Sequence, residues 1–205
     1  MFDFFKNIYD LLSNLEFWLS LLRGFKAAGP LYPIILTMIE AFFPILPLVA
    51  IVAFNVASHG YLWGFIYSWL GSVLGAFLVF SFFKRLRNYA LMQRIIGKNK
   101  INRVLTWVAK QNMLVLFVLS TLPFTPSSLI NISFGLAKYK SRDFLITIFL
   151  AKIIMISSLA FFGNTLVFNW DRPLLIIIAI IMMIGLYLLS IYINHKSGID
   201  KIDKN

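Results

Sequence analysis

The chain has 205 residues, of which 60% are hydrophobic and 13% charged, with a mean hydropathy of +0.84. Soluble domains average about 45–50% apolar and about 25% charged residues, so this composition excludes an ordinary soluble domain and indicates an integral membrane protein of one domain's length. Because cysteine is absent, disulfides, thiolate nucleophiles and cysteine-based metal sites are excluded.

The net charge of +11 is concentrated in one part of the sequence. No acidic residue occurs between Glu40 and Asp143, and the basic residues of this interval crowd a polar connection at 84–112. This pattern is typical of a cytoplasmic loop, with attraction of residues 84–110 to anionic headgroups as a secondary effect. The connection lacks a base-reading or stacking motif, so we do not expect a nucleic-acid partner. Its basic residues are Lys84, Arg85, Arg87, Arg94, Lys98, Lys100, Arg103 and Lys110.

The N-terminal segment, residues 1–28, is ambiguous. Its apolar part at 4–22 is interrupted by Asp10, Asn14 and Glu16. It fits either a marginal first transmembrane helix or an amphipathic helix on the membrane surface. Neither its charges nor its small residues follow the pattern of a cleavable signal peptide.

Two later apolar stretches, 31–56 and 113–137, are each cut by a Pro-x-x-Pro pair, and the pairs are offset by 79 residues. Proline lacks a backbone N–H and clashes with the preceding turn, so each pair should break a helix and leave backbone carbonyls without partners. The half-helix at 31–43 would be only about 20 Å long, too short to cross a hydrocarbon core of about 30 Å. We expect two re-entrant hairpins, with proline-kinked helices as the alternative. The prolines are Pro44, Pro47, Pro123 and Pro126.

Charges on the flanks predict how these hairpins are oriented. Basic residues both precede and follow the stretch at 113–137, which predicts entry from the cytoplasm. The helix at 61–83 should begin outside, so the first hairpin should enter from the opposite face. The expected fold is therefore an all-α polytopic membrane protein with an inverted repeat of two opposed re-entrant helical hairpins.

Uncharged or nearly uncharged runs predict the transmembrane helices. Residues 61–83 and 174–193 carry no charge, and 144–168 is interrupted by Lys152. Each run meets the requirement of about 20 residues, giving three spans, or four with the N-terminal segment. The tail at 194–205 is expected to be cytoplasmic.

The second break carries a helix start suited to anions. Thr125 is predicted as the N-cap, Pro126 as the first helical residue, and Ser127 and Ser128 supply hydroxyls in the first turn. Exposed N–H groups at a helix start favour phosphate, so this segment is a candidate phosphate site. The alternative is that the hydroxyls only satisfy the backbone of their own broken helix.

Glu40 and Lys152 are the ionisable residues inside the apolar blocks. Glu40 lies one turn before the first break, where a carboxyl group in a low dielectric is a candidate proton or coupling site. Lys152 is positioned to pair with Glu40 or with a ligand phosphate, unless its long side chain extends to the membrane surface. His59 and His195 are not accompanied by other residues in a metal-ligand spacing, and the sequence contains no recognisable combination of catalytic residues. We therefore expect neither an enzyme nor a bound cofactor or metal.

The order of motifs resembles the DedA and SNARE-associated (VTT-domain) membrane protein superfamily over residues 29–170. The motifs are Glu40-x-x-x-Pro44-x-x-Pro47, then Gly60, Gly64, Gly71, Gly75 and Lys84-Arg85, then Leu122-Pro123-Phe124-Thr125-Pro126, Asn131, Gly135 and Arg142-Asp143-Phe144-Leu145.

The resemblance implies opposed re-entrant hairpins and lipid transport, in bacteria notably of polyprenyl phosphates at the plasma membrane, with proton coupling. By position, the resemblance implies functional roles for Glu40, Arg85, Asn131 and Arg142. The chain departs from many relatives at Ser120, where they have an arginine, and at Lys84, where they have a glycine.

The sequence thus predicts a bacterial plasma-membrane transporter or scramblase of polyprenyl phosphate or phospholipid, with membrane lipids as partners and the oligomeric state left open. A headgroup phosphate is expected to meet the helix start at 125–128 together with Lys152 or Arg142. The alternatives are a proton- or ion-coupled carrier of a small solute that uses Glu40, and a membrane scaffold that transports nothing.

Overall fold

The computed structural model describes residues 29–43, 47–123, 125–168 and 171–196, together with residues 24 and 27. Regular structure in these residues is entirely helical, as predicted. Most of the segment at 1–28, Pro44 and the end of the C-terminal tail lie outside the described residues. The helices are α3 (Leu31–Glu40), α4 (Leu48–His59), α5 (Tyr61–Leu86), α6 (Ala90–Ile96), α7 (Asn99–Ala109), α8 (Met113–Thr121), α9 (Ser127–Leu136), α10 (Ser141–Phe168) and α11 (Pro173–Lys196).

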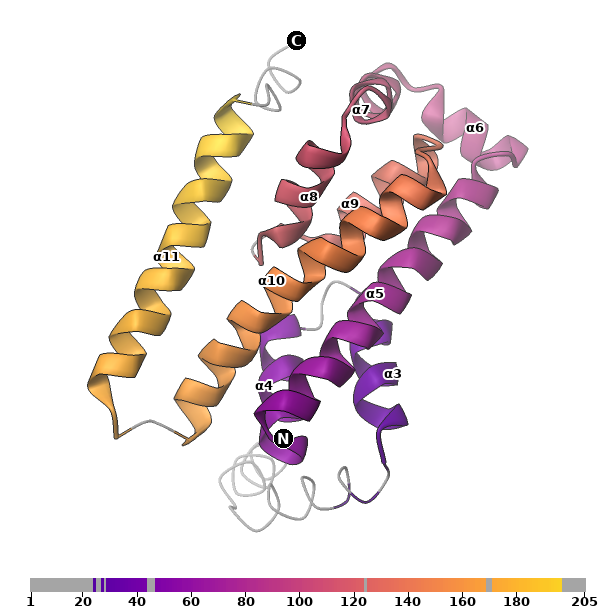
Figure 1. The fold of residues 1–205 in the computed structure, drawn as a ribbon. Coiled ribbons are helices and arrows are strands. Elements are labelled where there is room, and N and C mark those ends of the chain that lie inside the picture. Colours follow the sequence, from indigo (N-terminus) through magenta and orange to yellow (C-terminus); the bar gives the residue numbers. More distant parts are fainter. Residues whose placement is uncertain are drawn as a thin grey trace, which may run out of the picture.

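Two long helices form the frame of the molecule (Figure 1). The 26 residues of α5 and the 28 residues of α10 correspond to rods of about 40 Å. Among the described residues, these two helices are long and apolar enough to cross a membrane, and the bent pair α7–α8 adds a third crossing if it is counted as one span. Helix α5 contacts α3, α4, α9 and α10, so it is the axis of the bundle.

Two pairs of short helices, α3–α4 and α8–α9, flank this frame. Each helix has 9 to 12 residues, about half the length needed to cross the hydrocarbon core. In Figure 1, α3–α4 lies beside the first half of α5 and α8–α9 reaches into the bundle from the other end. Both second helices start after an extended proline: Pro47 has ψ 104° and Pro126 has ψ 105°. The breaks therefore fall where the proline pairs predict them.

The basic connection expected at 84–112 is largely helical. Helix α5 continues to Leu86, and α6 and α7 follow before the chain bends by 112° into α8. Leu105 and Val108 of α7 and Ile96 of α6 are buried against the α8–α9 pair. The many charged residues lower the average hydropathy of this stretch, which is why the sequence predicts a polar loop. A few apolar residues on one face are nevertheless enough to pack a surface helix against the bundle.

Glycines allow the short helices to approach α5 closely. A Cβ atom at Gly71 would collide with the backbone carbonyl oxygen of Ile34, and one at Gly135 would lie 2.5 Å from the carbonyl oxygen of Phe80. Such contacts are possible only without a side chain, so α3 and α9 pack backbone to backbone on the axis helix.

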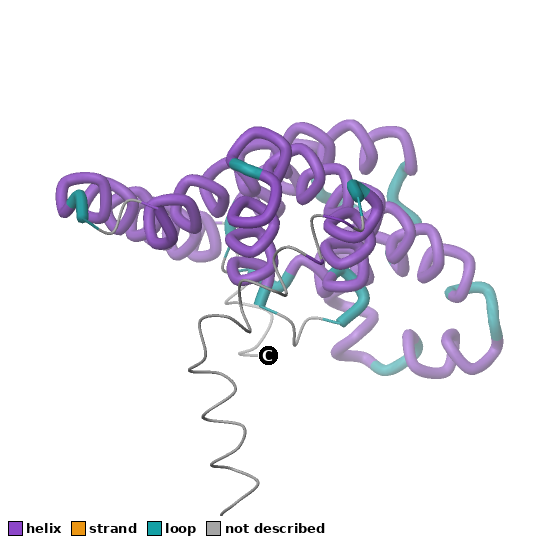
Figure 2. The backbone as a smooth tube through the Cα atoms, turned by 90° about the horizontal axis from the view of Figure 1, so that it is seen from below, coloured by secondary structure: helices purple, strands orange, loops and turns teal. Residues whose placement is uncertain are grey.

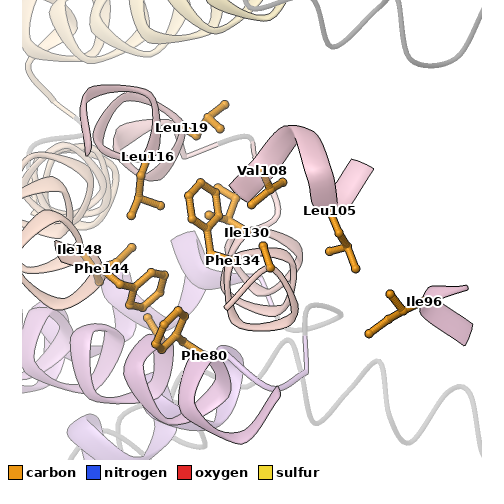
Figure 3. Close-up of a cluster of buried hydrophobic side chains, with 12 residues drawn as sticks. Phe80, Ile96, Leu105, Val108, Leu116, Leu119, Ile130, Phe134, Phe144 and Ile148 are labelled. Atoms are coloured by element: carbon orange, nitrogen blue, oxygen red, sulfur yellow. The ribbon is translucent and has the colours of Figure 1, made fainter. Parts of the chain in front are cut away.

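Each short pair has its own apolar core against α10. Near the end where α5 finishes, Phe80 stacks on Phe144 with ring centroids 3.9 Å apart, and Phe134 completes the cluster (Figure 3). In the other half, Val52 and Val56 of α4 pack on Ile156, Leu159 and other residues of α10. Helix α11 contacts α10 and lies at the side of the bundle (Figure 2).

Candidate functional site

The tips of both short pairs reach the middle of α5. A Cβ atom at Gly75 would touch Met38 and Ala41, so the end of α3 lies level with Gly75. Helix α9 ends beside the last turns of α5, where the Arg87 guanidinium donates to the carbonyl oxygen of Leu136. The start of α9 is nine residues earlier, about 14 Å back along the axis, and so returns to the middle of α5.

Lys152 lies at the same depth on α10, between the two apolar cores. One turn before it, Ile148 belongs to the first cluster, and one turn after it, Met155 belongs to the second. Its side chain is 1% exposed, and its Nζ atom lies 3.3 Å from the sulfur of Met155. The side chain therefore stays inside the bundle and does not extend to the membrane surface.

Glu40, the last residue of α3, is also buried, with 6% of its surface exposed. Within the described residues the two side chains form no direct ion pair, and Glu40 Oε2 has no hydrogen-bond partner. A direct ion pair with Glu40, one of the two roles that the sequence offers for Lys152, is therefore not formed.

In the described part of α8 and α9, three side chains also have buried polar atoms without a partner. They are the hydroxyls of Ser120 and Ser128 and both side-chain polar atoms of Asn131, as judged within the described residues. Burying an unpaired polar group costs about 1–3 kcal/mol, so folded proteins keep few of them. We call Glu40, Ser120, Ser128, Asn131 and Lys152 the polar layer.

The start of α9, which carries Ser128, has uncapped N–H groups. The helix begins at Ser127 with Pro126 as the N-cap, and no side chain caps it. The prediction placed the cap at Thr125, but Pro126 has an extended ψ and cannot be the first helical residue. Thr125 is half-buried in the preceding turn, and Ser127 and Ser128 occupy the first turn. Uncapped N–H groups at a helix start favour an anion.

Two predicted phosphate ligands lie elsewhere. Arg85 and Arg142 are exposed at the end of the bundle where α5 finishes and α10 begins. Arg142 is ten residues from Lys152 on the same helix, which corresponds to about 15 Å. The structure thus buries Ser128, Asn131 and Lys152 and leaves the two arginines exposed. We call this end of the bundle the basic end.

A polar cluster that sequence reasoning missed ties α3, α4 and α5 together. Asn55 Nδ2 lies 3.2 Å from Thr37 Oγ1, 2.9 Å from Ser68 Oγ and 3.4 Å from the carbonyl oxygen of Pro33. Thr37 also donates to Pro33 at 2.8 Å. An asparagine inside the apolar run of α4 was the signal that could have revealed it, because a membrane-buried amide needs partners.

Comparisons with known proteins agree with this architecture. The VTT domain family matches residues 43–165, which include both helix breaks from Pro44 onward and the helices α4 to α9 with most of α10. The "Uncharacterized membrane protein YhjE" of Bacillus subtilis (strain 168) is 33% identical over 168 residues, covering 82% of this chain and 81% of that protein. No solved structure is significantly similar. The chain therefore belongs to the VTT-domain (DedA) family of membrane proteins.

Proposed function

We propose that this protein moves a phosphate-bearing lipid across the bacterial cell membrane as a transporter or scramblase. The substrate is a polyprenyl phosphate or a phospholipid, and the basic end and the C-terminus face the cytoplasm. Membership of a family commonly related to membrane transport supports the general class. The polar layer is the single observation that carries the specific proposal.

The polar layer has the composition that a phosphate headgroup needs at the middle of a membrane protein. Lys152 offers a buried cation, and the uncapped start of α9 offers N–H donors. Ser128 and Asn131 add hydrogen-bonding groups that have no partner among the described residues. Because this chain has Ser120 where the family resemblance implies an arginine, we propose that Lys152 supplies the positive charge here.

A lipid fits the surroundings of the polar layer better than a small solute does. Immediately after Glu40, Phe42 is 43% exposed and Phe43 is 59% exposed, and Leu129 at the start of α9 is 58% exposed. Apolar side chains on the outside of both tips are compatible with hydrocarbon. A headgroup could therefore enter the layer sideways while its tails remain in the bilayer.

In this mechanism the two short pairs alternate as gates from opposite faces, each reaching the layer from one end of the bundle. Glu40 exchanges a proton as access changes, because a carboxylate beside an incoming phosphate would repel it, whereas the neutral acid would not. Lys152 balances the remaining negative charge. The proposed roles of Thr125, Ser127 and Ser128 are to orient the phosphate at the helix start.

The test is flux in reconstituted vesicles. The full-length protein is placed in liposomes with a labelled polyprenyl phosphate or a labelled phospholipid, and movement between leaflets is measured from pH 5.5 to 8.5. We expect movement of at least one lipid above that in empty liposomes. We expect Glu40→Gln to abolish the pH dependence. Asp171→Asn, at an exposed position after α10, is the matched acid-to-amide control.

The outcomes separate the candidate functions. Absence of flux for both lipids would contradict the lipid proposal and favour a solute carrier or a scaffold. Lipid flux with an unchanged pH profile in the Glu40→Gln variant would support lipid transport but contradict the proposed proton role of Glu40.

A further inference from the structure

A groove at the basic end runs along the last third of α5. It encloses about 770 Å³, within the range of about 300–1,000 Å³ that small-molecule sites occupy. One part of its wall is apolar and the other is cationic. The apolar part is Phe77, Leu78 and Phe82 of α5, and the cations are Lys84, Arg85 and Lys138.

The two parts follow each other along the helix. Phe77, Leu78 and Phe82 come first, and Lys84 and Arg85 follow toward the end of the bundle. The distance from Phe77 to Arg85 along α5 is about 12 Å. Leu78 is 45% exposed and Phe82 is 54% exposed, so the apolar wall faces outward. This polarity matches a lipid whose chains lie toward the membrane interior and whose phosphate lies at the surface.

Lys84 is held in place at the cationic end of the groove. Its Nζ atom lies 2.6 Å from the carbonyl oxygen of Tyr139 and 2.9 Å from Ser141 Oγ, and 5.2 Å from the ring centroid of Phe80. An ammonium group has three protons, so these bonds leave one donor for a ligand. The cation is therefore positioned before any ligand binds.

Lys138 gives a second, independent indication that the groove binds an anion. Its φ is +56°, and the bonds Lys138 N–H to Gly135 O and Tyr139 N–H to Phe134 O form a Schellman motif at the end of α9. Glycine is the usual residue at this position, because L side chains are strained there. At Lys138 the chain therefore accepts backbone strain and presents a cation in the wall of the groove.

We infer that this groove binds an anionic phospholipid of the leaflet at the basic end, with its phosphate between Lys84, Arg85 and Lys138 and an acyl chain along Phe82. The apolar wall selects a lipid over a soluble phosphate. This site is distinct from the polar layer and does not depend on lipid transport, because it concerns a bound lipid.

The test measures binding and not flux. The full-length protein in neutral detergent is titrated with phosphatidylglycerol, or with phosphatidylcholine of the same chains, and bound lipid is counted by native mass spectrometry. We expect phosphatidylglycerol to bind preferentially. Arg85→Gln with Lys138→Gly should weaken its binding about 30-fold, the usual contribution of two basic residues near an anionic surface. Arg94→Gln with Arg103→Gln removes the same charge from α6 and α7, outside the groove, and should leave binding unchanged.

The single variant Lys138→Gly distinguishes a ligand role from a turn role. We expect it to raise the melting temperature, because glycine relieves the strain, and yet to weaken phosphatidylglycerol binding. If it stabilises the protein and leaves binding intact, Lys138 is only a turn residue and the inference fails. Equal loss in the two double variants, equal binding of the two lipids, or full displacement by inorganic phosphate would also overturn it.

Discussion

At the scale of single residues, the unusual feature is two opposite charges that are buried but not joined. Glu40 ends α3 and Lys152 lies in α10, and both helices contact α5. A directly bonded pair would satisfy both groups and close the site. Held apart, the two groups can each contact a ligand, which is a property of binding sites more than of structural ion pairs.

This arrangement predicts a coupling between the two residues. Lys152→Met leaves Glu40 without its opposite charge, so we expect a lower melting temperature in detergent. Glu40→Gln combined with Lys152→Met should recover part of the loss, with a coupling free energy of about 0.5–3 kcal/mol in a double-mutant cycle of unfolding. Additive effects would show that the two charges do not interact. Lys110→Met, at an exposed position, is the control.

At the scale of helices, close packing on α5 places the polar layer. Helix α3 is only ten residues long, and its position depends on Gly71 and Gly75, which let its backbone lie against the axis helix. The cluster around Asn55 adds hydrogen bonds of about 0.6–2 kcal/mol each in a membrane interior. Together these contacts determine how deep Glu40 lies.

Gly71→Leu should therefore displace α3. The added side chain would collide with the carbonyl oxygen of Ile34 and the side chain of Thr37, and overpacking of this kind costs about 1–3 kcal/mol. We expect a lower melting temperature and reduced lipid flux. Gly185→Leu in α11 is the matched control, since a Cβ atom there meets nothing within 4 Å. Equal stability of the two variants would contradict this packing role.

At the scale of the whole molecule, two half-length helix pairs enter one frame from its two ends. Each pair contributes to its own apolar core against α10, and Lys152 lies between these cores. In the mechanism that we propose, this division lets one pair move while the other stays packed.

The absence of cysteine allows a direct test of this topology. Single cysteines replace Lys110 and Lys140, which flank the α8–α9 pair, or Asp171, which follows α10; all three positions are exposed. In oriented vesicles, a membrane-impermeant maleimide should label the cysteines at 110 and 140 from one side and the cysteine at 171 from the other. Labelling of 110 and 140 from opposite sides would show that α8–α9 spans the membrane and is not re-entrant.

Several features of the fold could be predicted without coordinates. Composition alone indicates a membrane protein, because 60% hydrophobic residues exceed what a soluble surface tolerates. The positions of Pro47 and Pro126 predict the starts of α4 and α9, because proline acts on the local backbone wherever it occurs. The family was also recognisable from the same motifs.

The remaining features required the tertiary structure. Lys152 and Glu40 are buried, whereas Arg85 and Arg142 lie exposed at the basic end, and this difference depends on how each helix packs in the bundle. The groove beside Lys138 depends on a turn between two helices. Local backbone preferences determine where helices break, but packing between residues far apart in the chain determines which polar groups meet. The sequence by itself therefore determined the membrane class and the breaks, and only the tertiary structure decided which charges share a site.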